Sequence, residues 1–201
     1  MAWAACADTL SRTMSENLRN YTKAVYGFDH VLRLTSEKAL ARKSPCQGWT
    51  GKDVVEHAFQ GVKMMQSFAA TGNGPKSLPK VGVDPWKAWA KLRDDTFAVL
   101  DQPGVLQGTA KEPFGPGFGD MSVDDLLGFM SADLTVHTWD LARTAKVDER
   151  IDAGLAKATL AAWKALPEEV LRMEGMFSPA VKPIKGADAQ ARLLNFLGRE
   201  V

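Results

Sequence analysis

The sequence predicts an all-α protein, a four-helix bundle followed by additional short C-terminal helices. Apolar residues recur at steps of three and four along several long segments, as on the buried side of a helix. Three of these segments begin with a helix-capping pattern. No segment has the strong apolar–polar alternation typical of a strand, and no internal repeat is visible.

Length and composition are those of one globular domain, which we expect to span residues 1–201, with a bundle core at about 8–146 and an extension at about 150–201. Apolar residues make up 45% and charged residues 24%, which excludes wholesale disorder. A formal net charge of +1 argues against a nucleic-acid partner, and no apolar run is long enough for a membrane span. Two cysteines form no disulfide framework and the start lacks a basic signal region, so we expect a cytoplasmic protein.

The first predicted helix covers about residues 10–32 and has the most regular apolar stripe. One side of this helix must therefore pack against other helices. The stripe consists of Leu10, Met14, Leu18, Tyr21, Val25, Phe28 and Leu32.

The second predicted helix starts at Thr50, which forms a capping box with Asp53, and ends at about Ala70. The third starts at Asp84-Pro85, a capping side chain followed by proline at the first helical position, and ends at about Leu100. Both helices carry apolar residues at helical spacing, so both belong to the bundle.

The fourth predicted helix covers about residues 123–145 and starts after the capping pair Ser122 and Asp125. The loop at 114–119 that precedes it is rich in glycine, so a lid over a cavity and a simple connector are both open. Short helices are expected after residue 150, ending with a last helical turn at 189–197. The first of them should direct Leu155, Ala158, Ala162 and Leu166 inward.

Three polar residues interrupt the apolar stripe of the fourth helix: Asp133, His137 and Asp140. Burying a carboxylate without a partner costs several kcal/mol, so another group must compensate the charge. Asp133 and His137 lie one turn apart and point the same way. Because carboxylate oxygen and imidazole nitrogen are both good ligands for divalent cations, the pattern indicates a metal site.

A third ligand is available on the second helix, where His57 lies beside the apolar stripe. If the second and fourth helices face each other, His57, Asp133 and His137 form a two-histidine, one-carboxylate site. Three protein ligands with an open position are typical of catalytic zinc and of non-haem iron. The alternatives are a hydrogen-bonded core histidine, an ion pair within the helix, or a pair between Asp133 and Arg143 or Arg42.

Several neighbouring residues have two interpretations each. Trp49 and Trp139 either line a cavity or pack in the core. Asp140 either orients a ligand histidine or forms an ion pair with Arg143 or a helix end. Cys46, at the entrance to the second helix, is either a thiol activated by the helix N-terminus or a small buried residue.

The segment SPCQGWTGKDVVEH, which ends at His57, resembles the P-C-x-G-W-x-x-x-D-x-x-x-H signature of DinB-like proteins. The closer match is the actinobacterial branch that contains the N-terminal domain of mycothiol-dependent maleylpyruvate isomerase. The segment DLTVHTWDLAR, from Asp133 to Arg143, resembles the second signature of that branch, acidic-x-x-x-H-x-W-D-L-A-R. The segment AQARLLNFLG is similar to the end of single-domain members, so the resemblance covers nearly the whole chain.

This resemblance implies a DinB-type four-helix bundle with a divalent metal ion held by His57, Asp133 and His137. Zinc is the first ion expected, nickel and iron are the alternatives, and a mycothiol-type thiol is the implied cosubstrate. The isomerase has a glutamate where this chain has Asp133, so ligation through water is an alternative to direct ligation. The residues after Arg150 are too few for the separate C-terminal domain of the isomerase.

Two classes of function follow. The first is a metal-dependent thiol S-transferase or isomerase acting on a small electrophile, because a divalent metal lowers the pKa of a coordinated water or thiol. The second is a metal-binding bundle without catalysis, with a stress-related or ligand-sensing role. An open coordination position beside a solvent-connected cavity favours the first class. A coordination sphere completed by protein groups, or the lack of a cavity, favours the second. DinB-like bundles often pair, which makes a homodimer one expected state.

Overall fold

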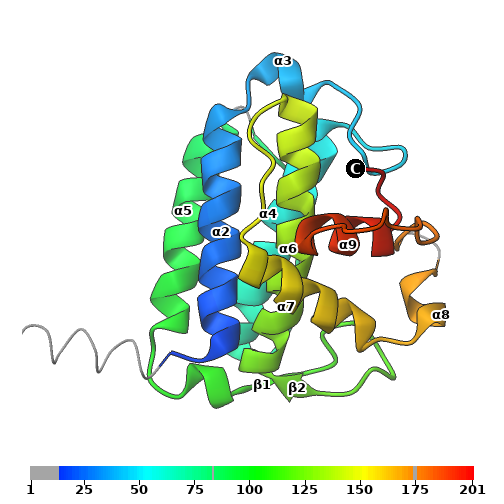
Figure 1. Ribbon diagram of the computed structural model, residues 1–201. Helices are drawn as coiled ribbons and strands as arrows, with labels where there is room; N and C mark the ends of the chain where they lie inside the picture. Colours follow the sequence, from blue (N-terminus) through cyan, green and yellow to red (C-terminus); the bar gives the residue numbers. More distant parts are fainter. Residues whose placement is uncertain (1–13, 83, 174–175) are drawn as a thin grey trace, which may run out of the picture.

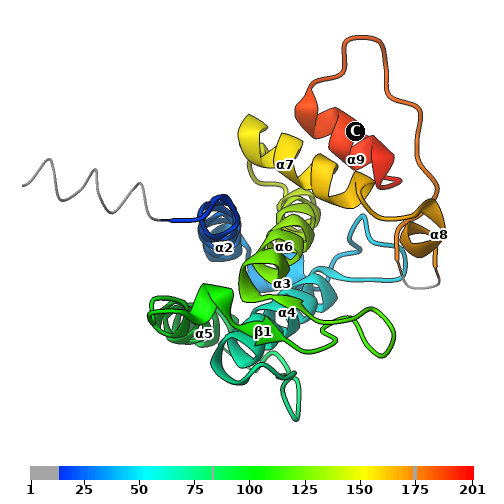
Figure 2. The same cartoon turned by 90° about the horizontal axis from the view of Figure 1, so that it is seen from below.

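The computed structural model describes residues 14–82, 84–173 and 176–201. The four long helices α2, α4, α5 and α6 stand side by side (Figure 1), and a view along their axes shows them at the corners of a four-sided bundle (Figure 2). The prediction of an all-α fold is confirmed.

Within the described residues, no helix combines the length and the apolar character that crossing a membrane requires. The elements are α2 (Glu16–Leu34), α3 (Glu37–Leu40), α4 (Gly51–Thr71), α5 (Pro85–Leu100), η1 (Val105–Gln107), β1 (Thr109–Ala110), β2 (Met121–Ser122), α6 (Val123–Ala145), α7 (Ala153–Lys164), α8 (Glu168–Leu171) and α9 (Ala189–Phe196).

The predicted helix starts with capping patterns are confirmed. Helix α4 begins after Thr50, and both hydrogen bonds of the capping box with Asp53 are present. Helices α5 and α6 begin after Asp84 and Ser122, whose side chains accept hydrogen bonds from the first turn. These caps satisfy backbone N–H groups that have no partner within the helix, which explains why the helices start at these residues.

Helix α2 starts later than predicted. It begins at Glu16 after the N-cap Ser15, and Met14 is exposed instead of buried. Leu10, the first residue of the predicted stripe, lies outside the described residues. From Leu18 onward the predicted stripe of this helix is buried.

The bundle core is apolar and rich in aromatic side chains. Trp89 of α5 packs against Phe28 of α2, with ring centroids 4.5 Å apart, and against Phe59 of α4 at 5.3 Å. All three rings are buried. Burial of such a side chain contributes about 1.5–3 kcal/mol, so this core holds α2, α4 and α5 against one another.

A short antiparallel ladder between α5 and α6 was not predicted. Strand β1 pairs with β2, with Thr109 opposite Ser122 and Ala110 opposite Met121. Two residues per strand are too few to produce an alternation in the sequence. The loop closed by this ladder packs Phe114 against Phe129 of α6, with ring centroids 5.4 Å apart. Its role as a lid stays a prediction.

The C-terminal segment, which comprises α7, α8 and α9, forms a second apolar cluster on the side of α6 that faces away from α5 (Figure 2). The predicted inward face of α7 is partly wrong. Ala158 and Ala162 are only half-buried, because α7 contacts α6 with one part of its surface and α9 with another. Leu166 is also half-buried and lies after the end of the helix. The buried residues of this helix are Leu155, Ala156, Thr159 and Trp163.

Candidate metal centre

The three predicted metal ligands lie together where α4 packs against α6. His57 Nε2 is 3.1 Å from Asp133 Oδ2, and His137 Nε2 is 3.5 Å from Asp133 Oδ1. One donor atom from each residue can be chosen so that all three lie within 4.8 Å of one another. The predicted approach of the two helices is therefore confirmed, and the role of the three residues as ligands stays a prediction.

This donor set fits a divalent metal ion. Bonds of about 2.0–2.2 Å to nitrogen and oxygen place neighbouring donors of one ion roughly 3–3.5 Å apart. The two distances from Asp133 to the histidines fall in this range. Two imidazoles and one carboxylate are suitable ligands for zinc, iron and nickel.

The cluster is buried on one side and open on the other. The side chain of His137 is 7% exposed, whereas those of Asp133 and His57 are 24% and 37% exposed. Trp49 covers both imidazoles, stacked on His137 with ring centroids 5.5 Å apart and packed against His57 at 5.1 Å. Trp49 thus lines the site, whereas Trp139 is buried in the core. Two of the three side chains are thus partly exposed, which is compatible with an open coordination position on that side.

The second ring nitrogen of His137 is held by Asp140. His137 Nδ1 lies 3.1 Å from Asp140 Oδ2, so that Nε2 is directed toward Asp133. Metal-binding histidines typically have such a carboxylate partner, which fixes the orientation of the ring. The alternative ion pair between Asp140 and Arg143 is wrong, because Arg143 pairs with Glu149 at 2.5 Å.

The proposed pairing of Asp133 with Arg143 or Arg42 is also wrong. The side chain of Arg42 donates to the backbone oxygen of Thr144, and Arg143 is directed to Glu149. Asp133 instead faces the two histidines. An ion pair between Asp133 and His137, one turn apart on α6, is the alternative to a metal site that agrees with the geometry.

The cation that pairs with Asp140 is Arg199, which sequence analysis missed. Arg199 Nε donates to Asp140 Oδ1 at 2.8 Å and Nη2 donates to Oδ2 at 2.7 Å. Asp140 lies 59 residues before Arg199 in the chain. Local periodicity carries no information on a contact between such distant segments. The glycine at position 198 is the local feature of the sequence that indicates a turn next to Arg199.

The backbone after α9 directs Arg199 into the molecule. Gly198 has φ +78°, and a Cβ atom at this position would lie 2.7 Å from the Cβ of Ser178. Only glycine combines this conformation with such a close approach. The turn is held by a hydrogen bond from Arg199 N to Leu194 O at 2.8 Å, and the Arg199 side chain is buried.

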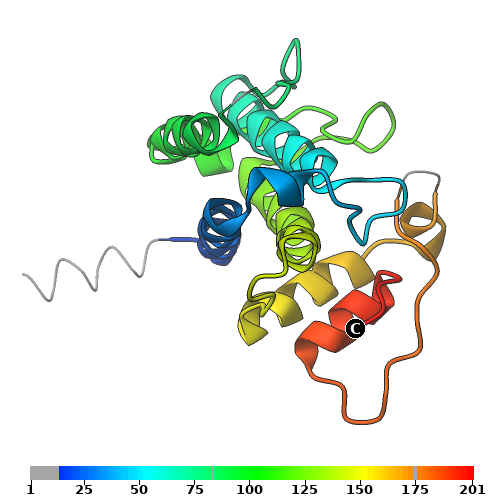
Figure 3. The ribbon, with the colours of Figure 1, turned by 90° about the horizontal axis from the view of Figure 1, so that it is seen from above.

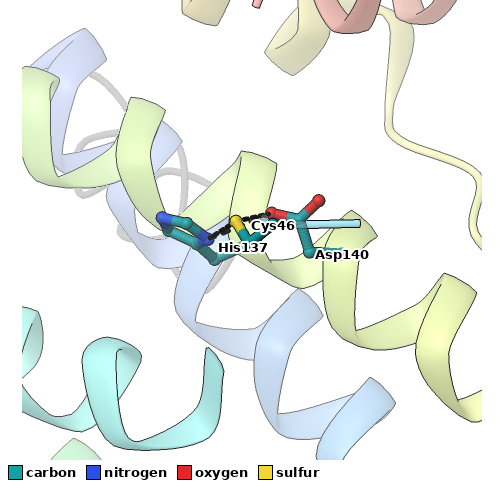
Figure 4. Close-up of side chains that lie close together, drawn as sticks. All are labelled: Cys46, His137 and Asp140. Carbon is teal, nitrogen blue, oxygen red and sulfur yellow. Dashed lines mark hydrogen bonds and ion pairs between the residues drawn. The ribbon is translucent and has the colours of Figure 1, made fainter. Parts of the chain in front are cut away.

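Cys46 lies beside Asp140 and His137 (Figure 4). Its Sγ donates to Asp140 Oδ2 at 3.3 Å and lies 3.9 Å from His137 Nδ1. Cys46, His137 and Asp140 also form a group with metal-ligand spacing. Arg199 already places a positive charge 2.7 Å from Asp140 and 3.4 Å from the sulfur, which would repel a cation there. The set around Asp133 is therefore the better candidate.

Charge interactions set the protonation of the cluster when no metal ion is bound. Burial raises the pKa of Asp133, but attraction to His137 and His57 outweighs this effect and holds the pKa well below its usual range. Burial lowers the pKa of His137, but Asp133 and Asp140 together raise it well above its usual value. Burial likewise opposes ionisation of Asp140, yet hydrogen bonds from Arg199 and His137 lower its pKa to about 2. Both carboxylates are thus ionised at neutral pH, and a metal ion would displace a proton from His137.

Comparison with known proteins gives a family and several relatives. The profile of the family described as "Mycothiol maleylpyruvate isomerase N-terminal domain" matches residues 22–142. Two uncharacterized proteins of Mycobacterium tuberculosis, from the strains CDC 1551 / Oshkosh and ATCC 25618 / H37Rv, are each 30% identical over 185 residues, which is 92% of this chain and 98% of theirs.

Two solved structures are also similar to this chain. They are the crystal structures of the mycothiol-dependent maleylpyruvate isomerase and of a histidine-to-alanine mutant of it, both 17% identical to this chain, with TM-scores of 0.49 and 0.46. The similarity covers 73% of this chain and 66% of theirs. The chain thus spans slightly less than two thirds of the length of those solved chains.

Proposed function

The chain belongs to the mycothiol maleylpyruvate isomerase N-terminal domain family, and on this premise we propose that it binds a divalent metal ion and acts with a low-molecular-weight thiol on a small electrophile. The reaction would be an S-transfer or an isomerisation with a mycothiol-type thiol as cosubstrate. The observation that carries this proposal is the convergence of His57, Asp133 and His137. We treat residues 1–201 as one DinB-like domain in the cytoplasm, where thiols are kept reduced.

The three residues would hold the ion through two imidazole nitrogens and a carboxylate oxygen. Zinc is the first candidate, with nickel and iron as the alternatives. A divalent ion with an open position lowers the pKa of a thiol that binds to it, which makes the thiolate available near neutral pH. Asp133 carries a single negative charge, so it would only partly neutralise the ion.

The residues around the ligands would orient them and control access. Asp140 accepts a hydrogen bond from His137 Nδ1, and once a metal ion has displaced the proton of Nε2, the lone pair of that nitrogen would be free to bind the ion beside Asp133. Trp49 covers the two imidazole rings on one side and excludes water there. The side chains of His57 and Asp133 are partly exposed, and a thiol and an electrophile would approach from this side. This partly exposed side favours catalysis, whereas the small cavity beside Asp133, about 10 Å³, favours the alternative, a non-catalytic metal-binding bundle.

Elemental analysis of protein without a histidine tag tests the metal site. The variants are His57→Ala and His137→Ala, and the matched control is His30→Ala, which removes an exposed histidine of α2. We expect about one ion per chain in the wild type and in His30→Ala, and none in the other two variants. A wild type that holds no ion after incubation with zinc, nickel, iron and manganese salts would contradict the proposal.

A second experiment tests the thiol chemistry. The metal-loaded protein is incubated with mycothiol and either maleylpyruvate or a chromogenic aryl halide, and product formation is followed. We expect turnover of at least one of these electrophiles that disappears with a chelator and in His57→Ala. Full metal loading without any turnover would favour the non-catalytic alternative. The homodimer stays a prediction, which the native mass of the same preparation tests.

A further inference from the structure

The C-terminal segment reaches the candidate metal centre through Arg199. The guanidinium group binds both oxygens of Asp140, and the Asp140 side chain is fully buried. Asp140 Oδ2 also contacts His137 Nδ1, so a chain of contacts runs from Arg199 through Asp140 to His137. The loop between α3 and α4 extends toward the same segment (Figure 3), and Arg199 Nη2 contacts Cys46 Sγ of that loop at 3.4 Å.

We propose that Arg199 is a positioning residue for the metal ligand His137, and that it acts by fixing the carboxylate of Asp140. This inference rests on the proposed function, since it requires His137 to bind a metal ion. It assigns a role in metal binding to a part of the chain that lies outside the bundle.

The geometry of the contact supports a positioning role. A carboxylate held at one oxygen can still rotate about its bond to Cβ. The planar fork of an arginine holds both oxygens and thereby fixes the carboxylate plane. With the Asp140 plane fixed, the acceptor for His137 Nδ1 stays in one place, and the opposite nitrogen of the ring stays directed at Asp133.

The C-terminal segment docks on α6 through the second apolar cluster, which joins residues 132 and 136 of α6 to α7 and α9 without a charge. Arg172 at the end of α8 already ties the segment together by donating to the backbone oxygens of Ser178 and Phe196, at 2.8 and 3.0 Å. A buried ion pair is also close to neutral for stability when compared with apolar residues of similar volume. The place of Arg199 beside the carboxylate partner of His137 is therefore better explained by the metal site than by packing.

Measurements of metal affinity and ligand geometry test this role. Zinc dissociation constants are measured by competition with a chromophoric chelator, and Co²⁺ is used as a spectroscopic probe of the ligand field. The variants are Arg199→Met, Arg199→Lys and, as the matched control, Arg172→Met. The control loosens the same segment without touching Asp140.

We expect Arg199→Met to weaken zinc binding by about 10- to 100-fold, the usual effect of losing an outer partner of a metal ligand, and to shift the Co²⁺ absorption bands. Arg199→Lys should show a smaller loss, because an ammonium group keeps the charge and holds the carboxylate less rigidly. Arg172→Met should bind zinc as the wild type does, even if its unfolding temperature falls.

Three results would overturn the inference. The first is that Arg199→Met binds zinc as tightly as the wild type. This result would exclude the positioning role of Arg199 and leave the proposed metal site intact. Arg172→Met could lose as much affinity as Arg199→Met, which would show general loosening of the segment. A wild type that binds neither zinc nor cobalt would remove the proposed function and this inference with it. If Arg199→Met does not fold, the zinc affinity of Arg199→Lys is used to test the inference instead. A zinc affinity of Arg199→Lys equal to that of the wild type would then contradict it.

Discussion

Two regions of this protein, one fully buried and one buried on one side, are stabilised by opposite means. The bundle core consists of apolar and aromatic side chains such as Phe28, Phe59 and Trp89. The polar cluster lies beside it, on the part of α6 that contacts the α3–α4 loop and the C-terminal segment. We define this polar cluster as Cys46, His57, Asp133, His137, Asp140 and Arg199.

The difference shows how burial can serve either folding or chemistry. Apolar contacts have no preferred direction, so the bundle core tolerates a change in shape if the volume is kept. Each member of the polar cluster instead depends on a named partner at hydrogen-bond distance. Loss of one partner leaves a buried charge uncompensated, so conservative substitutions should affect the two regions unequally.

The largest expected difference comes from one conservative substitution in each region. Asp140→Asn should lower the free energy of unfolding by about 3–5 kcal/mol, because the buried Arg199 loses its counter-charge. Leu126→Met, at a fully buried core position, should cost less than about 1.5 kcal/mol. Urea unfolding of the two variants measures both values. Equal losses would show that the two regions do not differ in this way.

A double-mutant cycle would sharpen the same contrast. Asp140→Leu alone leaves Arg199 unpaired, whereas Asp140→Leu with Arg199→Met removes both charges, so the double variant should recover about 2 kcal/mol or more. The exposed pair of Lys91 and Asp95 is the control, with an expected coupling of about 0.5 kcal/mol or less. A coupling at Asp140 as small as that of the surface pair would contradict the prediction.

The polar cluster should contribute to the pH dependence of the stability of the metal-free protein. The pKa of Asp140 is lower in the folded protein than in the unfolded chain, so its stabilisation is present above about pH 4 and lost toward pH 2. This loss amounts to about 2 kcal/mol. The pKa of His137 is raised, so its contribution is present below about pH 6.5 and lost as the pH rises further.

Urea unfolding of chelator-treated protein from pH 2 to pH 9 measures both effects. Asp140→Asn is the control for the acid limb, which should become shallower in that variant. Stability that rises steadily above pH 7 would contradict the expected contribution of His137.

The smallest expected effect concerns the helix that carries His57. Thr50→Ala removes the N-cap of α4 and should lower the free energy of unfolding by about 1 kcal/mol. Lys52→Ala, an exposed change in the same helical turn, should have almost no effect. Neither variant should change the number of metal ions per chain, because the cap does not touch the polar cluster. A lower metal content in Thr50→Ala alone would show that the start of α4 also positions His57.

Much of the bundle could be predicted from the sequence, because the signals for its helices are local. Capping side chains at Thr50, Asp84 and Ser122 mark helix starts within a few residues, and apolar spacing identifies the buried faces. The inward face of α7 was predicted less well, since this short helix contacts α6 and α9 with different parts of its surface. The two-residue strands β1 and β2 produced no signal at all.

The candidate site could be predicted in part for the same reason. Asp133, His137 and Asp140 were recognisable because polar residues on a buried helix face need partners. For Asp140, the contact with His137 was one of two open interpretations, the other was a pair with Arg143 one turn away on α6, and Arg199 was missed. A nearby residue of the right charge is the natural choice from sequence, and only the packed chain shows that a distant one takes its place.

The sequence by itself determined most of the side chains of the long bundle helices that face inward, because helical periodicity depends on residues only three or four positions apart. The tertiary structure decided which of those side chains meet. Contacts such as those of His57 with Asp133 and of Arg199 with Asp140 join segments that are far apart in the chain. Their formation depends on how all the helices pack together, and in the case of Arg199 on a single glycine turn after α9.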